Sequence, residues 1–229
     1  MAHFRRAIEL DPYFAPAYGM AARCYAIRRA TGWVSDHALE TAEAARLVRL
    51  ATEFGRDDAV ALSTAGIATA FVLRDLAGAA ELLDRSLELN PSLAWAWLSS
   101  GWVKVWLGEP EAAIGCVNRA LRLSPHDTQR FNMRTAMASA HFVAGRYAEA
   151  LSWAVMALRE KPEFTLASCA AAASAALAGR QVEAEQALTV MRQREPSLAI
   201  SSLAEWLPCK RPQDLERWAE GLRKAGLPE

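Results

Sequence analysis

The residues whose side chains could do chemistry are scattered along this sequence, and no group of them has the spacing of a reactive site. The four histidines occur singly, without the i, i+4 pair around a carboxylate that binds zinc on a helix. They are His3, His37, His126 and His141. Serines such as Ser86 and Ser124 have no base and orienting acid that can be placed beside them. The sequence therefore predicts no catalytic residues, no metal and no cofactor.

The cysteines also give no sign of a metal or redox site, since they lie far apart and form no C-x-x-C pair. They are Cys24, Cys116, Cys169 and Cys209. We expect them to be reduced and mostly buried, as small apolar side chains. The residues from Met1 to Arg6 have no apolar segment of the secretory kind, which favours the cytoplasm. The run at 166–178 is shorter than the ~20 residues that a bilayer crossing needs, so no membrane partner is expected.

Composition bounds the function further. Apolar residues make up 52% of the 229 residues, enough to build a core and to exclude a disordered chain. Lysine and arginine total 26, as do aspartate and glutamate. A balanced chain lacks the positive field that gathers phosphates, so we expect no nucleic-acid partner.

Prolines mark an internal repeat. Pro91, Pro125, Pro162 and Pro196 follow helical patterns at intervals of 34, 37 and 34 residues. This period is typical of tetratricopeptide (TPR) repeats, which are pairs of antiparallel helices. Proline ends each helix because it lacks an N–H and excludes its predecessor from the helical region.

Within each repeat, a small residue follows the large residue of the first helix, and an alanine-rich second helix follows a glycine turn. Gly66 and Gly101 are such small residues and should let two helices approach closely. Gly108, Gly145 and Gly179 lie at the expected turns. The fold class is therefore all-α, a right-handed superhelix of antiparallel helix pairs.

We divide the chain, 1–229, as one TPR solenoid. It has a half repeat at 1–12, a long repeat at 13–58, repeats at 59–91, 92–125, 126–162 and 163–196, and capping helices at 197–229. The long repeat has a surplus near 28–36, where we expect an insertion or a longer hairpin. Its second helix should bury a face made of Leu39, Ala42, Leu47 and Leu50.

The two ends carry different expectations. The chain starts with a second helix that lacks its first, so we expect a piece of a longer protein. A last helix with Leu215, Trp218, Ala219 and Leu222 on one face is followed by Gly226 and Pro228, stop signals that read as a terminal cap.

Three stretches carry a family resemblance: GWVKVWLGEPEAAI (101–114), RLSPHD (122–127) and GLRKAGLPE (221–229). The chain resembles the C-terminal TPR region of bacterial class III adenylate or guanylate cyclase-like proteins and winged-helix regulators of the rhizobial type. The resemblance implies a cytoplasmic signalling protein with an N-terminal effector domain. It carries over no nucleotide chemistry, because the paired metal-binding aspartates of a cyclase have no counterpart here.

In TPR proteins the first helices line the concave face, and this implies a partner-binding groove. The groove residues are Val60, Ser63, Ile67, Phe71, Trp95, Leu98, Trp102, Val105, Trp106, Gln129 and Asn132. Tryptophan is enriched among interface anchors, although aromatic residues at helical spacing also fill cores. The Lys, Arg and Asn cluster that grips a peptide carboxylate in chaperone-binding members is missing apart from Asn132.

The leading hypothesis is a non-catalytic scaffold that binds a protein, a peptide or its own effector domain in this groove. Two alternatives stay open: a homodimerisation element using the half repeat or the tryptophan helix, and a small-molecule sensor.

Overall fold

The computed structural model describes residues 1–31 and 33–229, and within these ranges it contains helices and no strand. The chain forms two compact units, Met1–Val103 and Lys104–Glu229, each of which is described by itself. The single-solenoid division of 1–229 stays a prediction. Gly32, inside the predicted insertion, lies outside the described residues.

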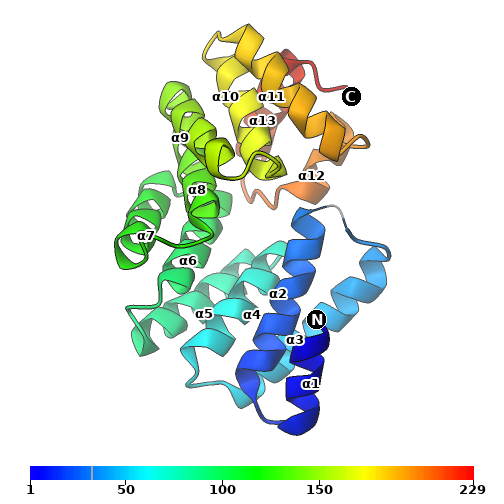
Figure 1. The fold of residues 1–229 in the computed structure, drawn as a ribbon, viewed down its shortest axis with the longest axis vertical. Coiled ribbons are helices and arrows are strands. Elements are labelled where there is room, and N and C mark those ends of the chain that lie inside the picture. Colours follow the sequence, from blue (N-terminus) through cyan, green and yellow to red (C-terminus); the bar gives the residue numbers. More distant parts are fainter. Residues whose placement is uncertain (32) are drawn as a thin grey trace. The chain divides into compact units, whose positions relative to one another are not determined.

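The first unit is built of helix pairs joined by short turns (Figure 1). Its helices are α1 (Ala2–Leu10), α2 (Ala15–Ala30), α3 (His37–Phe54), α4 (Ala59–Phe71), α5 (Leu76–Leu89) and the first ten residues of α6 (Ala94–Leu107). Helix α2 packs against α3 and α4, and α4 packs against α5.

The second unit repeats this pattern and adds a different ending (Figure 1). After the end of α6 come α7 (Pro110–Leu123), α8 (Arg130–Val143), α9 (Tyr147–Glu160), α10 (Thr165–Leu177), α11 (Gln181–Arg194), the 3₁₀ turn η1 (Ile200–Ser202), α12 (Leu203–Trp206) and α13 (Pro212–Ala225). Helix α10 is in contact with α9, α11 and α13.

The helix ends follow from local chemistry. Asp36, Asp58 and Asp75 are N-caps whose carboxylates accept backbone N–H groups that have no partner inside the helix. Gly108, Gly145 and Gly179, expected at turns, have φ of 80°, 77° and 76°, a left-handed conformation that glycine adopts at little cost. These glycines each close a hairpin between a first and a second helix.

Small residues let the helices approach, as the repeat pattern predicts for Gly66. A Cβ on Gly66 would lie 3.0 Å from the Leu83 side chain of α5. A Cβ on Gly19 would overlap Thr64 Oγ1 and lie 2.8 Å from the Ala61 carbonyl oxygen of α4. The small side chains therefore fix the spacing of α2, α4 and α5.

Part of the surplus of the long repeat lies in its helices. Helix α2 has 16 residues and α3 has 18, whereas the helices from α4 to α11 have 13 or 14. The hairpin of this repeat is therefore longer than the others, and whether residues are also inserted near 28–36 stays a prediction.

The buried face of α3 is partly different from the predicted one. Leu47 is buried, but Leu39 is 66% exposed and Ala42 is also exposed. The face instead includes Glu40, whose carboxylate accepts hydrogen bonds from Arg28 of α2 at 2.6 to 3.2 Å. With Glu40 facing α2, the neighbouring Leu39, about 100° further around the helix, is exposed.

Two further expectations have a clear outcome. Of the four cysteines, which form no disulfide among the described residues, only Cys169 is buried, and burial raises the pKa of its thiol to about 12. The other three are half-buried, so the expectation of mostly buried cysteines was wrong. No helix in the described ranges combines the length and the apolar composition that a bilayer crossing requires.

The close approach at Gly19 gives a stability prediction. Replacing Gly19 by alanine forces a methyl group against Thr64 and Ala61, and overpacking of this kind costs about 1 to 3 kcal/mol. The matched change Gly115→Ala, on an exposed helical glycine with no heavy atom within 4 Å of its new Cβ, should stabilise by about 0.5 to 1 kcal/mol. Urea unfolding followed by circular dichroism measures both. Equal effects of the two changes would contradict the packing.

The ion pair of α2 and α3 gives a pH prediction. Hydrogen bonds from Arg28 hold the pKa of Glu40 below its usual range, so the charged carboxylate favours the folded state. That contribution is full above the ordinary glutamate pKa of about 4.3 and is lost as the pH falls through the lowered value. The urea midpoint of Glu40→Gln should lie below that of the parent at neutral pH and converge with it in acid. A difference that does not change with pH would contradict this role.

Candidate functional site

The predicted groove residues of α4 are mostly inside the first unit. Ser63, Ile67 and Phe71 are buried, and Val60 is 39% exposed. The Ser63 hydroxyl donates to the Val60 carbonyl oxygen at 3.1 Å, so its polar atom is satisfied within its own helix. Of the predicted residues on α4, Val60 is the one that is exposed.

The tryptophan helix α6 shows the same distribution. Leu98, Trp102, Val105 and Trp106 are buried, and Trp95 is half-buried. The Trp102 and Trp106 side chains therefore contribute to packing in the structure, the alternative that helical spacing of aromatic residues leaves open.

Trp95 lies under a side chain from α2. The Arg23 guanidinium stacks over its indole ring, with 3.8 Å between the guanidinium carbon and the ring centroid. A partially desolvated cation–π contact is worth about 0.5 to 2 kcal/mol. Because α2 and α6 belong to first helices two repeats apart, this contact covers the predicted anchor from within the first unit.

The remaining predicted residues, Gln129 and Asn132, are half-buried at the start of α8 in the second unit. The Gln129 backbone N–H donates to Asp127 Oδ1 at 2.8 Å, so the turn before α8 fixes their position. The predicted set is thus divided between the two units, and its role in partner binding stays a prediction.

The face of the second unit at the ends of α8 and α10 is covered by α13. Trp218 of α13 stacks on Phe142 of α8 with ring centroids 3.7 Å apart, and the Arg217 guanidinium donates to the Val143 carbonyl oxygen at 2.9 Å. A Cβ on Gly221 would lie 2.9 Å from the Ala173 carbonyl oxygen of α10. The predicted face of this helix is confirmed at the buried Trp218 and Leu222.

The chain also anchors both ends of α13. The Lys210 backbone N–H donates to the Trp106 carbonyl oxygen at 2.8 Å, and Gly226 ends the helix with φ of 103°. Helix α13 thus contacts α8, α10 and α11, and the segment just before it is hydrogen-bonded to the end of α6.

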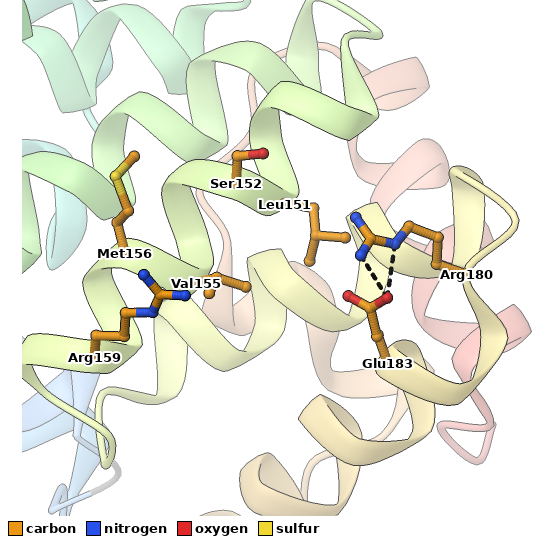
Figure 2. Close-up of a pocket in the computed structure, with 7 residues that line it drawn as sticks. All are labelled: Leu151, Ser152, Val155, Met156, Arg159, Arg180 and Glu183. Carbon is orange, nitrogen blue, oxygen red and sulfur yellow. Dashed lines mark hydrogen bonds and ion pairs between the residues drawn. The ribbon is translucent and has the colours of Figure 1, made fainter.

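An open surface remains between α9 and α11, the second helices of two successive pairs. It is a valley of about 440 Å³ lined by Leu151, Ser152, Val155, Met156, Arg159, Arg180 and Glu183 (Figure 2). Leu151 is buried, Val155 and Met156 are half-buried, and Ser152 and Arg159 are exposed. We call these seven residues the α9–α11 valley.

The valley has an apolar floor and a charged rim. In Figure 2, Arg159 lies on one side, the Arg180–Glu183 ion pair on the other, and Leu151 and Val155 between them. Both Arg180 contacts, 2.7 Å from Nε and 2.6 Å from Nη2, go to Glu183 Oε1. An apolar floor with fixed charges at its rim can bind a side chain of another protein.

The sequence contained a signal for this valley that our interpretation missed. The predicted binding groove includes none of Leu151, Arg159, Arg180 and Glu183. The available signal was the stripe of Leu151, Val155 and Arg159 at i, i+4 and i+8, which places apolar and basic side chains on one face of α9.

Comparison with known proteins supports the fold. PilW, described as a widely conserved type IV pilus biogenesis factor, is 16% identical, with 90% of this chain and 88% of PilW covered and a TM-score of 0.63. YrrB is 22% identical, with 85% and 93% covered and a TM-score of 0.51. MamA from Desulfovibrio magneticus RS-1 is 17% identical, with 80% and 97% covered and a TM-score of 0.55. The chain therefore has the TPR solenoid fold.

Sequence comparison adds no family assignment. No protein-family model matches the chain, and no curated protein sequence matches it. The structural likenesses establish the fold and do not bear on a cyclase or winged-helix parent.

The burial of the tryptophan helix gives a testable prediction. Trp102→Ala removes a side chain that is 6% exposed and should cost about 3 to 5 kcal/mol of unfolding free energy. Trp33→Ala, at a side chain that is 67% exposed, should change it by less than about 0.5 kcal/mol. Chemical denaturation compares the two variants. A fully stable Trp102→Ala variant would return this residue to the predicted binding surface.

Proposed function

We propose that this chain is a non-catalytic protein-interaction module and that it holds a segment of a partner protein in the α9–α11 valley. The observation that carries the proposal is the valley itself. It has a volume of about 440 Å³, within the range of about 300 to 1,000 Å³ seen for ligand sites, and exposes half-buried apolar side chains beside charged ones.

Among the described side chains, no group of three or more His, Cys, Asp or Glu could hold a metal ion. Among the structural neighbours, YrrB is described as a TPR protein with an unusual peptide-binding site. A peptide site on this fold is therefore a reasonable model for the α9–α11 valley.

The inner-face prediction remains part of the proposal in a narrower form. Val60, Trp95, Gln129 and Asn132 are the predicted groove residues with exposed or half-buried side chains. The resemblance to regulatory regions of cyclase-like proteins suggests a partner that belongs to the same polypeptide, namely its effector domain. If an effector domain bound through these residues and left the α9–α11 valley free, the chain would have the role of binding its own effector domain.

Self-association is a second candidate, favoured by one specific observation. The first unit exposes seven large apolar side chains, whereas the second unit exposes Val182 and Val190 among the described residues. The seven are Leu10, Tyr13, Phe14, Ile27, Trp33, Leu39 and Val60. Helix α1 contributes no buried residue, so the half repeat is the more exposed of the two surfaces considered for a dimer.

Selection of binders tests the proposed function. Peptides selected from a random display library on the purified chain are measured by fluorescence polarisation against the parent, Ser152→Trp and Val182→Trp. Ser152 is an exposed lining residue, so the new indole fills the valley, whereas Val182 is exposed on α11 outside the lining. We expect about tenfold or greater weakening with Ser152→Trp and no change with Val182→Trp.

Two results would overturn the proposal: recovery of no binding peptide, or peptides that bind Ser152→Trp as tightly as the parent. Light scattering on the same samples gives the solution mass. A dimer that dissociates on Leu10→Ser, together with failed selection, would instead assign the self-association role.

A further inference from the structure

We infer that the α9–α11 valley takes an acidic amphipathic helix, with an apolar stripe at its centre and a carboxylate towards each end. The inference rests on the proposed function and names the chemistry of the partner. Three features of the valley support it: the charge of Arg159, which is unpaired in the part of the chain that the structure describes, the weak ion pair of Arg180 with Glu183, and the helical spacing of the lining residues on α9.

Arg159 carries a positive charge with no acid beside it. Its guanidinium forms no hydrogen bond or ion pair with any residue in the described ranges. The acids nearest to it in sequence are already engaged. Glu160 contacts Arg130 and Arg134, the latter at 2.9 Å, and Glu163 contacts Lys161 at 2.5 Å. An anionic group from outside the molecule is therefore the partner that this charge lacks.

At the other end, Arg180 is only partly used. Its Nε and Nη2 atoms both contact one oxygen of Glu183, which leaves donors of a group that has five N–H bonds. The pair is exposed, with side-chain exposures of 51% and 40%, so solvent screens it and it contributes little to stability. A second carboxylate can share Arg180 with Glu183 or replace it at little cost.

The spacing selects a helix. Leu151, Val155 and Arg159 are separated by four residues each and lie on one stripe of α9. At 1.5 Å per residue, the distance from Leu151 to Arg159 along the axis is about 12 Å, or roughly two turns. A ligand helix lying in the valley can place apolar side chains over Leu151 and Val155 and a carboxylate one turn further on, beside Arg159.

Apolar anchoring and charge then have separate roles. Val155 and Met156 supply half-buried apolar area, which gives most of the affinity, while the arginines fix the direction and the charge of the segment. A basic helix with the same apolar stripe would bring like charges against Arg159.

A defined peptide pair tests the inference. The probe is a fluorescein-labelled helical peptide of about four turns. Two leucines lie one turn apart at its centre, and one glutamate lies one turn outside each leucine, towards the nearer end of the peptide. The matched peptide has lysine in place of both glutamates. Both are titrated against the full chain and against Arg159→Glu. The control variant is Arg122→Glu, because Arg122 is also an exposed arginine in the last turn of a second helix.

We expect the acidic peptide to bind at least about tenfold more tightly than the basic one, and Arg159→Glu to reverse or abolish that preference. Arg122→Glu should leave it unchanged. Binding of the acidic peptide should weaken as the salt concentration rises from about 0.05 M to about 0.5 M, because the charges are at the surface.

The inference fails if the two peptides bind equally, or if Arg159→Glu and Arg122→Glu have the same effect. Its failure is distinguishable from that of the proposed function. Library peptides that are lost on Ser152→Trp but carry no acidic residues would keep the valley as a binding site and remove only the acidic partner. Circular dichroism spectra of all variants confirm that each one is folded.

Discussion

Neighbouring helices in this chain approach closely because small residues lie where they pack. Gly19 faces Thr64, Gly66 faces Leu83 and Gly221 faces Ala173, and in each case a Cβ would come within 3.0 Å of an atom of the facing helix. Helix α10 extends the same principle, with buried alanines along most of its length. Because the spacing is set by these contacts, the side chains that can reach solvent are also set by it.

The close spacing of the helices explains why the tryptophans of α6 are buried while the α9–α11 valley stays open to solvent. Where first helices pack with small residues, the large side chains beside them fill the remaining space, and Trp102 and Trp106 become buried. Second helices are less covered, so Val155 and Met156 of α9 remain half-buried. Helix α13 packs on the first helices α8 and α10, through Trp218 against α8 and Gly221 against α10. The α9–α11 valley is the surface that these contacts leave open.

The fold could be predicted from the sequence because its signals are local. Proline spacing, the turn glycines and the small residue at Gly66 each depend on a few neighbouring residues, and each describes a helix boundary or a crossing. The exposed faces could not be predicted as well. At the start of α3, Glu40 pairs with Arg28 and is buried while Leu39 is exposed, and Arg23 of α2 stacks over Trp95. Both outcomes depend on side chains distant in sequence, which a periodic pattern does not encode.

We propose that the partner binds in the α9–α11 valley, whereas the tryptophans of α6 pack inside the protein. Amide hydrogen exchange of the full chain, with and without a saturating acidic peptide, tests it most directly. The account predicts slower exchange in the parts of α9 and α11 that line the valley, around 151–159 and 180–183, with α4 and α6 unchanged. Protection centred on Val60 and Trp95, with none in the valley, would contradict it.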